Sequence, residues 1–228
     1  TNKNEVTALA PGLTEILTAT SLETVSRSAI GFPLGSLFLV RNGGVDPATG
    51  RRIVLNKAGQ PVLYQFVVPA GQFQWTNPDG TQYKENGVAV GITQAKDGVM
   101  FGNTNPKIYG GFDNTFRYKN FDLNVLLTYQ FGYFIYYGSN AGLHDMRFWN
   151  NHVDVLTAWS KPGDVSTVPR PVYGDNVSNG SGLPMSYNAF KGDFVKLKNV
   201  TLSYTFAQSL LNKVKISSAR LFVSGQNL

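Results

Sequence analysis

The side chains best suited to binding a ligand are aromatic residues and arginines in two stretches rich in Gly, Pro and Asn. Aromatic rings stack on the C–H faces of sugars, and Trp, Tyr and Arg are the usual anchors of binding surfaces. The candidates are Trp75, Trp149, Trp159, Tyr173, Tyr187, Arg147 and Arg170. The alternative for each residue is that it packs its own loop against itself or against a neighbouring loop. We predict that ligand contacts, if the chain makes them, come from this set.

The sequence lacks the motifs of nucleotide binding, hydrolysis and metal coordination. Cysteine is absent, and the two histidines, His144 and His152, lie in the second of these stretches. They could form a metal pair or supply a catalytic base, but histidines in loops are usually only polar surface residues, and this is the simpler interpretation. Asp113 and Asp122 could be drawn as a carboxylate pair, yet a polar strand face accounts for both. We therefore predict no enzyme activity, no cofactor and no metal.

Composition places the chain among the all-β classes and excludes a typical nucleic-acid binder. The net charge is +6, but the 20 Lys and Arg residues are scattered along the chain and form no basic run. Nucleic-acid binding needs such charge gathered on one face. Charged residues make up 15% of the chain, against about 25% in soluble domains. This low share suggests that part of the surface does not face water.

The clearest secondary-structure signal is a long β-hairpin at residues 107–118 and 121–131, which lies between the two stretches that hold the candidate ligand contacts. Apolar residues of one parity alternate with polar residues of the other, as on a two-faced strand. The apolar set is Ile108, Phe112, Phe116, Tyr118, Phe121, Leu123, Val125, Leu127, Tyr129 and Phe131. Each arm has about the 9–11 residues that cross a bilayer at a tilt, and aromatics gather at both ends of the stripe. The pattern predicts an antiparallel transmembrane β-barrel segment; a soluble β-sandwich is the alternative.

Three further strands are predicted near residues 30–41, 194–206 and 218–228. Val195 and Leu197 have the opposite parity to Val200 and Leu202, which predicts a β-bulge near Asn199. The intervening residues 42–105 and 138–192 read as long irregular loops. Long loops that alternate with short turns are typical of outer-membrane barrels, where loops are long outside and turns are short on the periplasmic side.

Several strings, taken in order, resemble the SusC/RagA family of TonB-linked outer-membrane proteins. They are NPKIYGGFDNTFRYKNFDL at 105–123, GDFVKLKNVTLSY at 192–204 and SSARLFVSGQNL at 217–228, with weaker matches at 2–7, 31–36 and 159–164. The resemblance implies a large closed barrel, of about 22 strands in plugged transporters, with a plug domain and a TonB-coupling segment. No part of this chain matches the plug or the coupling segment. We expect residues 1–228 to supply about five strands from the C-terminal part of the barrel.

The resemblance also implies a function and partners. It implies TonB-dependent active import of oligosaccharides or peptides across the outer membrane, with a SusD-like surface lipoprotein, the TonB complex and outer-membrane lipid as partners, and no nucleic acid. The chain departs from many relatives in one loop, because residues 77–80 and 96–98 lack the alternating carboxylates of a calcium loop. A soluble all-β carbohydrate-binding or adhesion module, and a passive porin, remain as alternatives.

Overall fold

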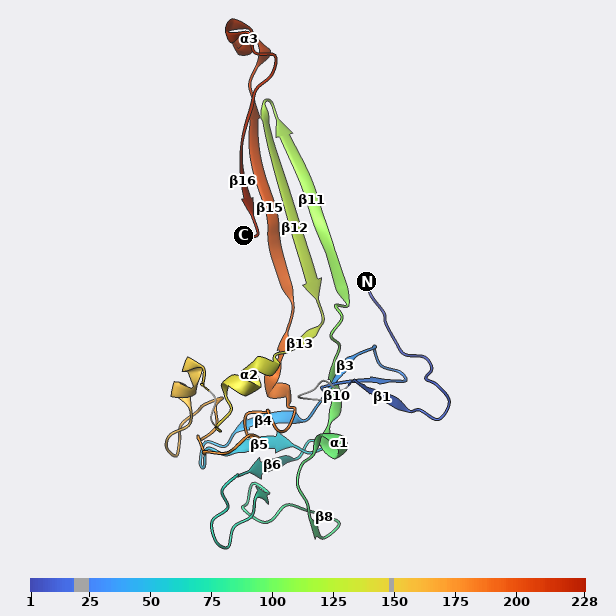
Figure 1. Ribbon diagram of the computed structural model, residues 1–228, viewed down its shortest axis with the longest axis vertical. Helices are drawn as coiled ribbons and strands as arrows, with labels where there is room; N and C mark the ends of the chain where they lie inside the picture. Colours follow the sequence, from blue (N-terminus) through green and yellow to red (C-terminus); the bar gives the residue numbers. More distant parts are fainter. Residues whose placement is uncertain (19–24, 148–149) are drawn as a thin grey trace. The chain divides into compact units, whose positions relative to one another are not determined.

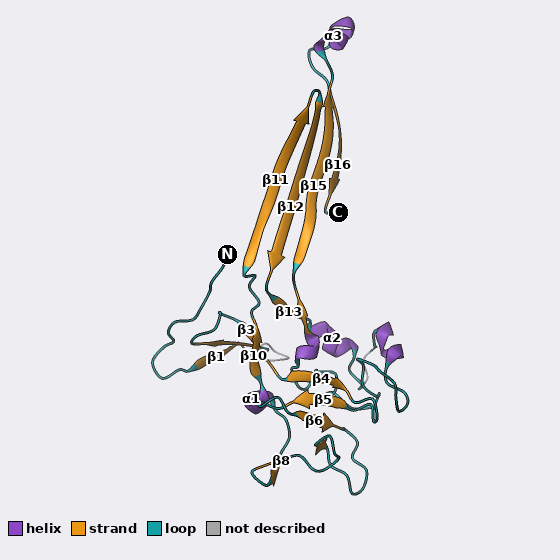
Figure 2. Cartoon of the chain, turned by 180° about the vertical axis from the view of Figure 1, so that it is seen from behind, coloured by secondary structure: helices purple, strands orange, loops and turns teal. Residues whose placement is uncertain are grey.

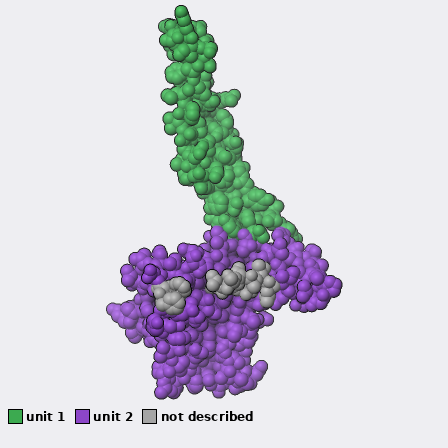
Figure 3. Space-filling model, viewed as in Figure 1, with its two compact units in different colours: residues 1–3, 105–133, 192–228 green, residues 4–104, 134–191 purple. Residues whose placement is uncertain are grey.

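The computed structural model describes residues 1–18, 25–147 and 150–228, in which strands are many and helices few and short. The chain forms two compact units, which are coloured separately in Figure 3. Unit 1 comprises residues 1–3, 105–133 and 192–228, and unit 2 comprises residues 4–104 and 134–191. Within the described residues, no helix has both the length and the apolar character needed to cross a membrane.

Unit 1 is a four-stranded antiparallel sheet in the order β11-β12-β15-β16, as Figure 1 shows. Its strands are β11 (Ile108–Tyr118), β12 (Phe121–Phe131), β15 (Phe194–Thr205) and β16 (Arg220–Gln226). A tight turn at Lys119, with φ at 52°, joins β11 to β12. The short helices α3 (Gln208–Leu211) and η3 (Asn212–Val214) lie in the connector from β15 to β16. Pairing of β12 with β15 joins segments that are separated in sequence by part of unit 2.

A β-bulge in β15 sets which side chains share a face. Leu126 pairs with Asn199, but the next residue of β12, Leu127, pairs with Leu197, so Lys198 is the extra residue. The bulge predicted near Asn199 is therefore confirmed. Because one extra residue reverses the alternation, Val195 and Leu197 lie on the same face as Val200 and Leu202.

The pairing registers give the sheet one apolar face. Its large residues occupy opposed positions on all four strands. They are Ile108, Phe112, Phe116, Tyr118, Phe121, Leu123, Val125, Leu127, Tyr129, Phe131, Val195, Leu197, Val200, Leu202, Tyr204, Leu221 and Val223. Asn114 is the one polar side chain among the described residues of this face. We call this set the apolar face.

The opposite side of the sheet, the polar face, carries hydrogen-bonded polar side chains. Asn124 Nδ2 donates to Asp113 Oδ1 at 2.8 Å, and Asn199 Nδ2 donates to Asn124 Oδ1 at 3.1 Å, which links three strands. Nearer the turn, Asp122 lies 3.1 Å from Arg117 and 3.6 Å from Arg220. Asp113 and Asp122 thus have separate partners on different rungs of the ladder. Leu126, Phe194 and Phe222 are large apolar residues on this face.

Unit 2 holds short strands and short helices, coloured by type in Figure 2. One sheet pairs β4 (Arg41–Val45), β5 (Arg52–Leu55), β6 (Pro61–Tyr64) and β7 (Trp75–Thr76); another pairs β1 (Glu15–Thr18), β2 (Ser26–Ala29), β3 (Ser36–Leu39) and β10 (Val99–Gly102). Two-stranded pairs form from β8 (Lys84–Glu85) with β9 (Val88–Ala89), and from β13 (Phe134–Tyr136) with β14 (Ala189–Lys191). The helices are α1 (Gln94–Asp97), α2 (Gly138–Leu143), η1 (Val153–Thr157) and η2 (Ser186–Asn188).

The core of unit 2 joins its first part to residues 183–185. Val40, Val54 and Val62 pack with Tyr83 and Ile92 and with Leu183 and Met185. Residue 40 also forms a β-bridge to Met185. The stretch 138–192 holds only short helices and the three-residue β14 within its described residues, and this core contact anchors its end.

Two expectations from the sequence were wrong. Residues 42–105 do not form an irregular loop, because they hold strands β4 to β10 and α1. Their strands are short, and β6 is buried at three successive residues, so it lacks the alternation that marks a two-faced strand. Residues 30–41 are not one strand either. Gly31 and Gly35 have φ of 85° and 70° and form turns, and strand structure begins only at Ser36.

Candidate functional site

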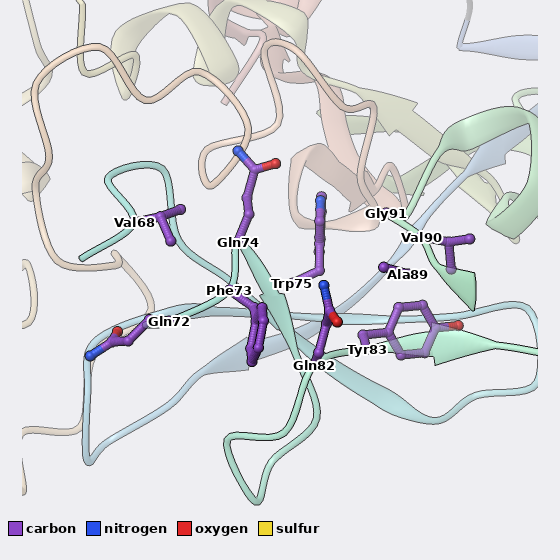
Figure 4. Close-up of a pocket in the computed structure, with 10 residues that line it drawn as sticks. All are labelled: Val68, Gln72, Phe73, Gln74, Trp75, Gln82, Tyr83, Ala89, Val90 and Gly91. Carbon is purple, nitrogen blue, oxygen red and sulfur yellow. The ribbon is translucent and has the colours of Figure 1, made fainter. Parts of the chain in front are cut away.

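The surface of unit 2 contains a hollow of about 560 Å³ beside β7. Its walls come from two segments that follow each other in the sequence, residues 68–75 and 82–91, and Figure 4 shows the side chains. The lining residues are Val68, Gln72, Phe73, Gln74, Trp75, Gln82, Tyr83, Ala89, Val90 and Gly91. The two segments are held together because Tyr83 N donates to Trp75 O at 3.0 Å.

Trp75 is fixed in the wall of this hollow. It pairs with Tyr64 across β6 and β7, and the two ring centroids are 4.6 Å apart. Gly91 lies against the indole edge, where an added Cβ would come within 2.7 Å of Trp75 Nε1. Since both neighbours hold the ring, little side-chain entropy remains to be lost when a ligand stacks on it.

Uncharged polar groups surround the indole. Among the described residues, neither the Gln74 nor the Gln82 side chain makes a hydrogen bond within the protein, whereas Gln72 Oε1 accepts from Arg51 Nη2 at 3.0 Å. Phe73 adds an exposed apolar ring. None of the lining side chains is charged. Amides next to aromatic rings suit a neutral ligand that carries hydroxyl or amide groups.

Tyr83 contributes its ring to the hollow, but its hydroxyl is already engaged. The hydroxyl donates to Glu85 Oε1 at 2.5 Å and accepts from Asn56 Nδ2 at 3.1 Å. Burial, together with the hydrogen bond to the Glu85 carboxylate, raises the pKa of Tyr83. Lys96 Nζ in turn lies 3.0 Å from Glu85 Oε1. This network positions the Tyr83 ring, and it uses the hydroxyl for hydrogen bonds within the protein rather than for a ligand.

Tyr187 lies at a second hollow, of about 580 Å³, with Tyr137, Asn140, Asp154, Thr167 and Phe190. Asp154 lies between the two histidines: His144 Nε2 is 2.9 Å from Oδ2, and His152 Nδ1 is 2.8 Å from Oδ1. Burial acts to raise the pKa of Asp154, but the histidines outweigh it, so this pKa lies below its ordinary value. In the part of the chain that the structure describes, no group of three or more His, Cys, Asp or Glu residues is placed to hold a metal ion.

Two of the predicted ligand contacts, the buried Trp159 and the exposed Arg147, have hydrogen-bond partners within the protein. Trp159 is buried, its Nε1 donates to Pro47 O at 2.9 Å, and its ring covers Gly50. The Arg147 guanidinium donates hydrogen bonds of 2.8 and 2.7 Å to the buried Asp145 carboxylate. These hydrogen bonds raise the pKa of Arg147.

Two further predicted contacts, Arg170 and Tyr173, do not line either hollow. Arg170 is exposed beside a small crevice next to Arg51, and its backbone N donates to Gly50 O at 2.8 Å. Tyr173 is 82% exposed. Trp149 lies outside the described residues. The six predicted residues that the structure describes therefore do not converge on one site: Trp75 and Tyr187 line different hollows.

The prediction missed Phe73, Gln74, Gln82 and Gly91. A local signal was present in the sequence, because residues 71–75 read GQFQW, in which amides and aromatics alternate. Gln82 and Gly91 carry no such signal. They reach the hollow only because the chain returns beside β7.

Comparison with known proteins shows which sequences this chain resembles. No family model matches it. It is 31% identical over 144 residues to TonB-dependent receptor P3 of Formosa agariphila, and the match covers 60% of this chain and 13% of that receptor. TonB-dependent receptor P39 of the same organism is 32% identical over 126 residues, covering 54% of this chain and 12% of that receptor. TonB-dependent receptor P26 is 28% identical over 154 residues, covering 65% and 15%.

Solved structures agree on the fold. The RagAB peptide transporter matches with a TM-score of 0.68 and 22% identity, over 98% of this chain and 22% of that one. The same importer in its closed-closed state matches with a TM-score of 0.67 and 20% identity, with the same coverage. These relatives are named as receptors and transporters, not as enzymes. The motifs, the sequence similarity and the fold agree: the chain is similar to part of the TonB-dependent receptors, as its resemblance to the SusC/RagA family predicted.

Proposed function

We propose that the parent protein actively imports oligosaccharides or peptides across the outer membrane, driven by the TonB complex and assisted by a SusD-like lipoprotein. The names of the relatives support import that depends on TonB, and the RagAB peptide transporter is a precedent for peptide import. The chain spans only 13% of the length of receptor P3. Transport is therefore assigned to the whole protein, and this chain supplies part of its barrel and part of its outer surface.

The observation that carries the proposal is the two-faced sheet of unit 1. Strands β11 and β12 have 11 residues each, about the length that crosses a bilayer at a tilt. The apolar face includes Phe112, Phe116 and Leu202, which are all exposed. The polar face has side-chain hydrogen bonds across three strands. A barrel strand that faces lipid on one side and a wet interior on the other has this division.

The orientation follows from the connections between strands. The turn at Lys119 is short, whereas the chain between β12 and β15 runs through unit 2 for most of its length. Turns are short at the periplasmic side of such barrels and loops are long outside. Unit 2 then belongs to the extracellular side, where a ligand or a lipoprotein lid would meet it.

Within unit 2, the hollow at Trp75 is the proposed ligand contact. Its aromatic and amide lining has no charge, so it would bind uncharged parts of a ligand, either sugar hydroxyl groups or a peptide backbone. Tyr187, Arg147, Arg170, Tyr173 and Trp149 stay as secondary candidates.

Paired substitutions in the parent protein test the orientation of the sheet. Phe112→Arg places a charge on the apolar face, and Thr115→Arg places the same charge on the polar face of the same strand. Arginine facing lipid at mid-bilayer costs about 2–4 kcal/mol. We expect the first variant to lose most of its heat-resistant, barrel-folded protein in outer-membrane fractions, while the second keeps it.

Equal behaviour of the two variants would contradict the proposal. A folded, monomeric parent that needs no detergent would instead support the soluble binding or adhesion module. Uptake of labelled oligosaccharides and peptides by cells with and without TonB then separates active import from a passive pore.

A further inference from the structure

The connector between β15 and β16 exposes large apolar side chains. Leu210, Val214 and Ile216 are 53%, 61% and 47% exposed, while Leu211 is buried. Leu210 and Val214 are four residues apart across α3 and η3, a spacing that brings two side chains to one side of a helical turn. A connector that faced only water would gain nothing from three such residues.

The charge of the connector has one sign. Lys213 and Lys215 lie among the apolar residues, and residues 207–217 contain no Asp or Glu. A third lysine, Lys119, lies in the β11–β12 turn, with its Nζ 5.4 Å from the centroid of the Tyr118 ring. The pairing registers put this turn and the connector at the same end of the sheet, since Tyr118 pairs with Phe121, which pairs with Tyr204.

Aromatic rings cover the apolar face at this same end. The ring centroids of Phe121 and Tyr204 are 4.8 Å apart, and those of Tyr204 and Phe206 are 5.1 Å apart. Aromatic residues concentrate where acyl chains meet headgroups. Lysines just beyond this level extend their amines toward headgroup phosphates. The connector therefore begins where an aromatic belt ends.

We propose that residues 207–217 form an interfacial anchor that docks onto the phospholipid leaflet at this end of the strands. Leu210, Val214 and Ile216 enter the boundary between headgroups and acyl chains, and Lys213 and Lys215 contact phosphates. The mixture of apolar and basic residues without acidic ones is that of segments lying on anionic membranes. A protein partner fits less well, because a stable interface needs about 800 Å² from each side, more than so short a connector offers. The inference rests on the proposed barrel.

Spin labels in the full parent protein, reconstituted in bilayers of phosphatidylcholine and phosphatidylglycerol, test the anchor. Leu210→Cys and Val214→Cys carry the label in the proposed lipid contact, and Gln208→Cys on the same helical turn is the matched control. Collisions with oxygen report hydrocarbon, and collisions with a water-soluble nickel chelate report water. We expect the ratio of oxygen to nickel collisions to be several-fold higher at 210 and 214 than at 208.

A label at a third position distinguishes a wrong anchor proposal from a wrong barrel proposal. Phe112→Cys reports the middle of the apolar face. If the label at 112 is in lipid but labels at 210 and 214 resemble the label at 208, the anchor is wrong and the barrel stands. Low collision rates with both reagents at 210 would mean that protein covers the connector, which also overturns the anchor. A water-exposed label at 112 would overturn the proposed function itself.

The lysines are tested in the same reconstituted protein. Adding phosphatidylglycerol to phosphatidylcholine bilayers should raise the oxygen-to-nickel ratio at 210. The K213Q/K215Q variant should lose this increase. If the K213Q/K215Q variant shows the same increase in this ratio as the unsubstituted protein, the proposed contact of the two lysines with phosphates is refuted.

Discussion

The guanidinium carbon of Arg52 lies 4.5 Å from the centroid of the Tyr187 ring, inside unit 2. Arg52 is fully buried, and this burial lowers its pKa to about 10, so the side chain is still charged at neutral pH. The guanidinium also donates to Ser178 O at 2.6 Å and to Thr167 O at 3.2 Å. One side chain from β5 thus ties the sheet to residues 167–187.

Replacing Arg52 with Met should loosen this junction. The variant keeps an apolar stem but leaves the buried Ser178 carbonyl and the partly buried Thr167 carbonyl without their charged donor, and each such hydrogen bond contributes about 1.5–3 kcal/mol. We expect a loss of about 3 kcal/mol or more in the free energy of unfolding of unit 2. Limited proteolysis of the purified parent in urea measures it. Arg51→Met is the control, since Arg51 donates to Gln72 near the surface; equal losses in both variants would contradict the assignment.

Asp145 should make unit 2 sensitive to acid. Burial acts to raise its pKa, but hydrogen bonds from Arg147 and Ser181 outweigh it, so the pKa of Asp145 lies below its ordinary value of 3.8. The folded state therefore binds this proton less readily than the unfolded state. Its stabilisation is complete above the unfolded pKa and is lost as pH falls through the folded pKa.

The Asp145→Asn variant should consequently lose less stability than wild type between about pH 7 and about pH 3. At neutral pH it should be about 1–3 kcal/mol less stable, because an amide nitrogen in place of Oδ2 cannot accept the hydrogen bond from Arg147 Nη2. Thermal unfolding across this pH range measures both effects. Parallel pH curves for the two proteins would show that Asp145 does not titrate as inferred.

Deleting Lys198 should damage the barrel far more than replacing it. The deletion removes the bulge and moves Val195 and Leu197 to the polar face. Lys198→Ala keeps the residue count and therefore the register. In outer-membrane fractions, we expect little folded protein for the deletion and near wild-type amounts for Lys198→Ala. A well-folded deletion variant would show that the register is fixed by other contacts.

The hollow at Trp75 should account for part of ligand affinity. The purified parent can be screened against neutral oligosaccharides and peptides, and any binder compared across variants. Trp75→Ala should weaken binding about tenfold or more, as expected for a rigid aromatic anchor. Gln82→Ala should weaken it less.

Tyr173→Ala is the matched control for this measurement, because Tyr173 is an aromatic residue of the same unit that lies outside the hollow. A larger effect at Tyr173 than at Trp75 would move the ligand site away from the hollow. Trp75→Phe should retain most of the affinity, since it keeps a ring against Tyr64 and tests whether loss of packing explains the alanine result.

The sequence alone determined the two-faced strands of unit 1. A strand exposed to different surroundings on its two sides must alternate, so β11 and β12 could be read from residue types and spacing. The parity change between Leu197 and Val200 gave the bulge for the same reason. These features are local, and each is fixed by residues that are neighbours in the chain.

Only the tertiary structure decided which loop residues are available to a ligand. Trp75 and Trp159 both lie in stretches rich in Gly and Pro, yet one lines a hollow and the other is buried over Gly50. The short strands of residues 42–105 were hidden because each has only a few residues, and because β6 is buried at three successive residues and does not alternate. Exposure depends on partners far away in the sequence, and pairing such as that of β12 with β15 forms only when the chain has returned from unit 2.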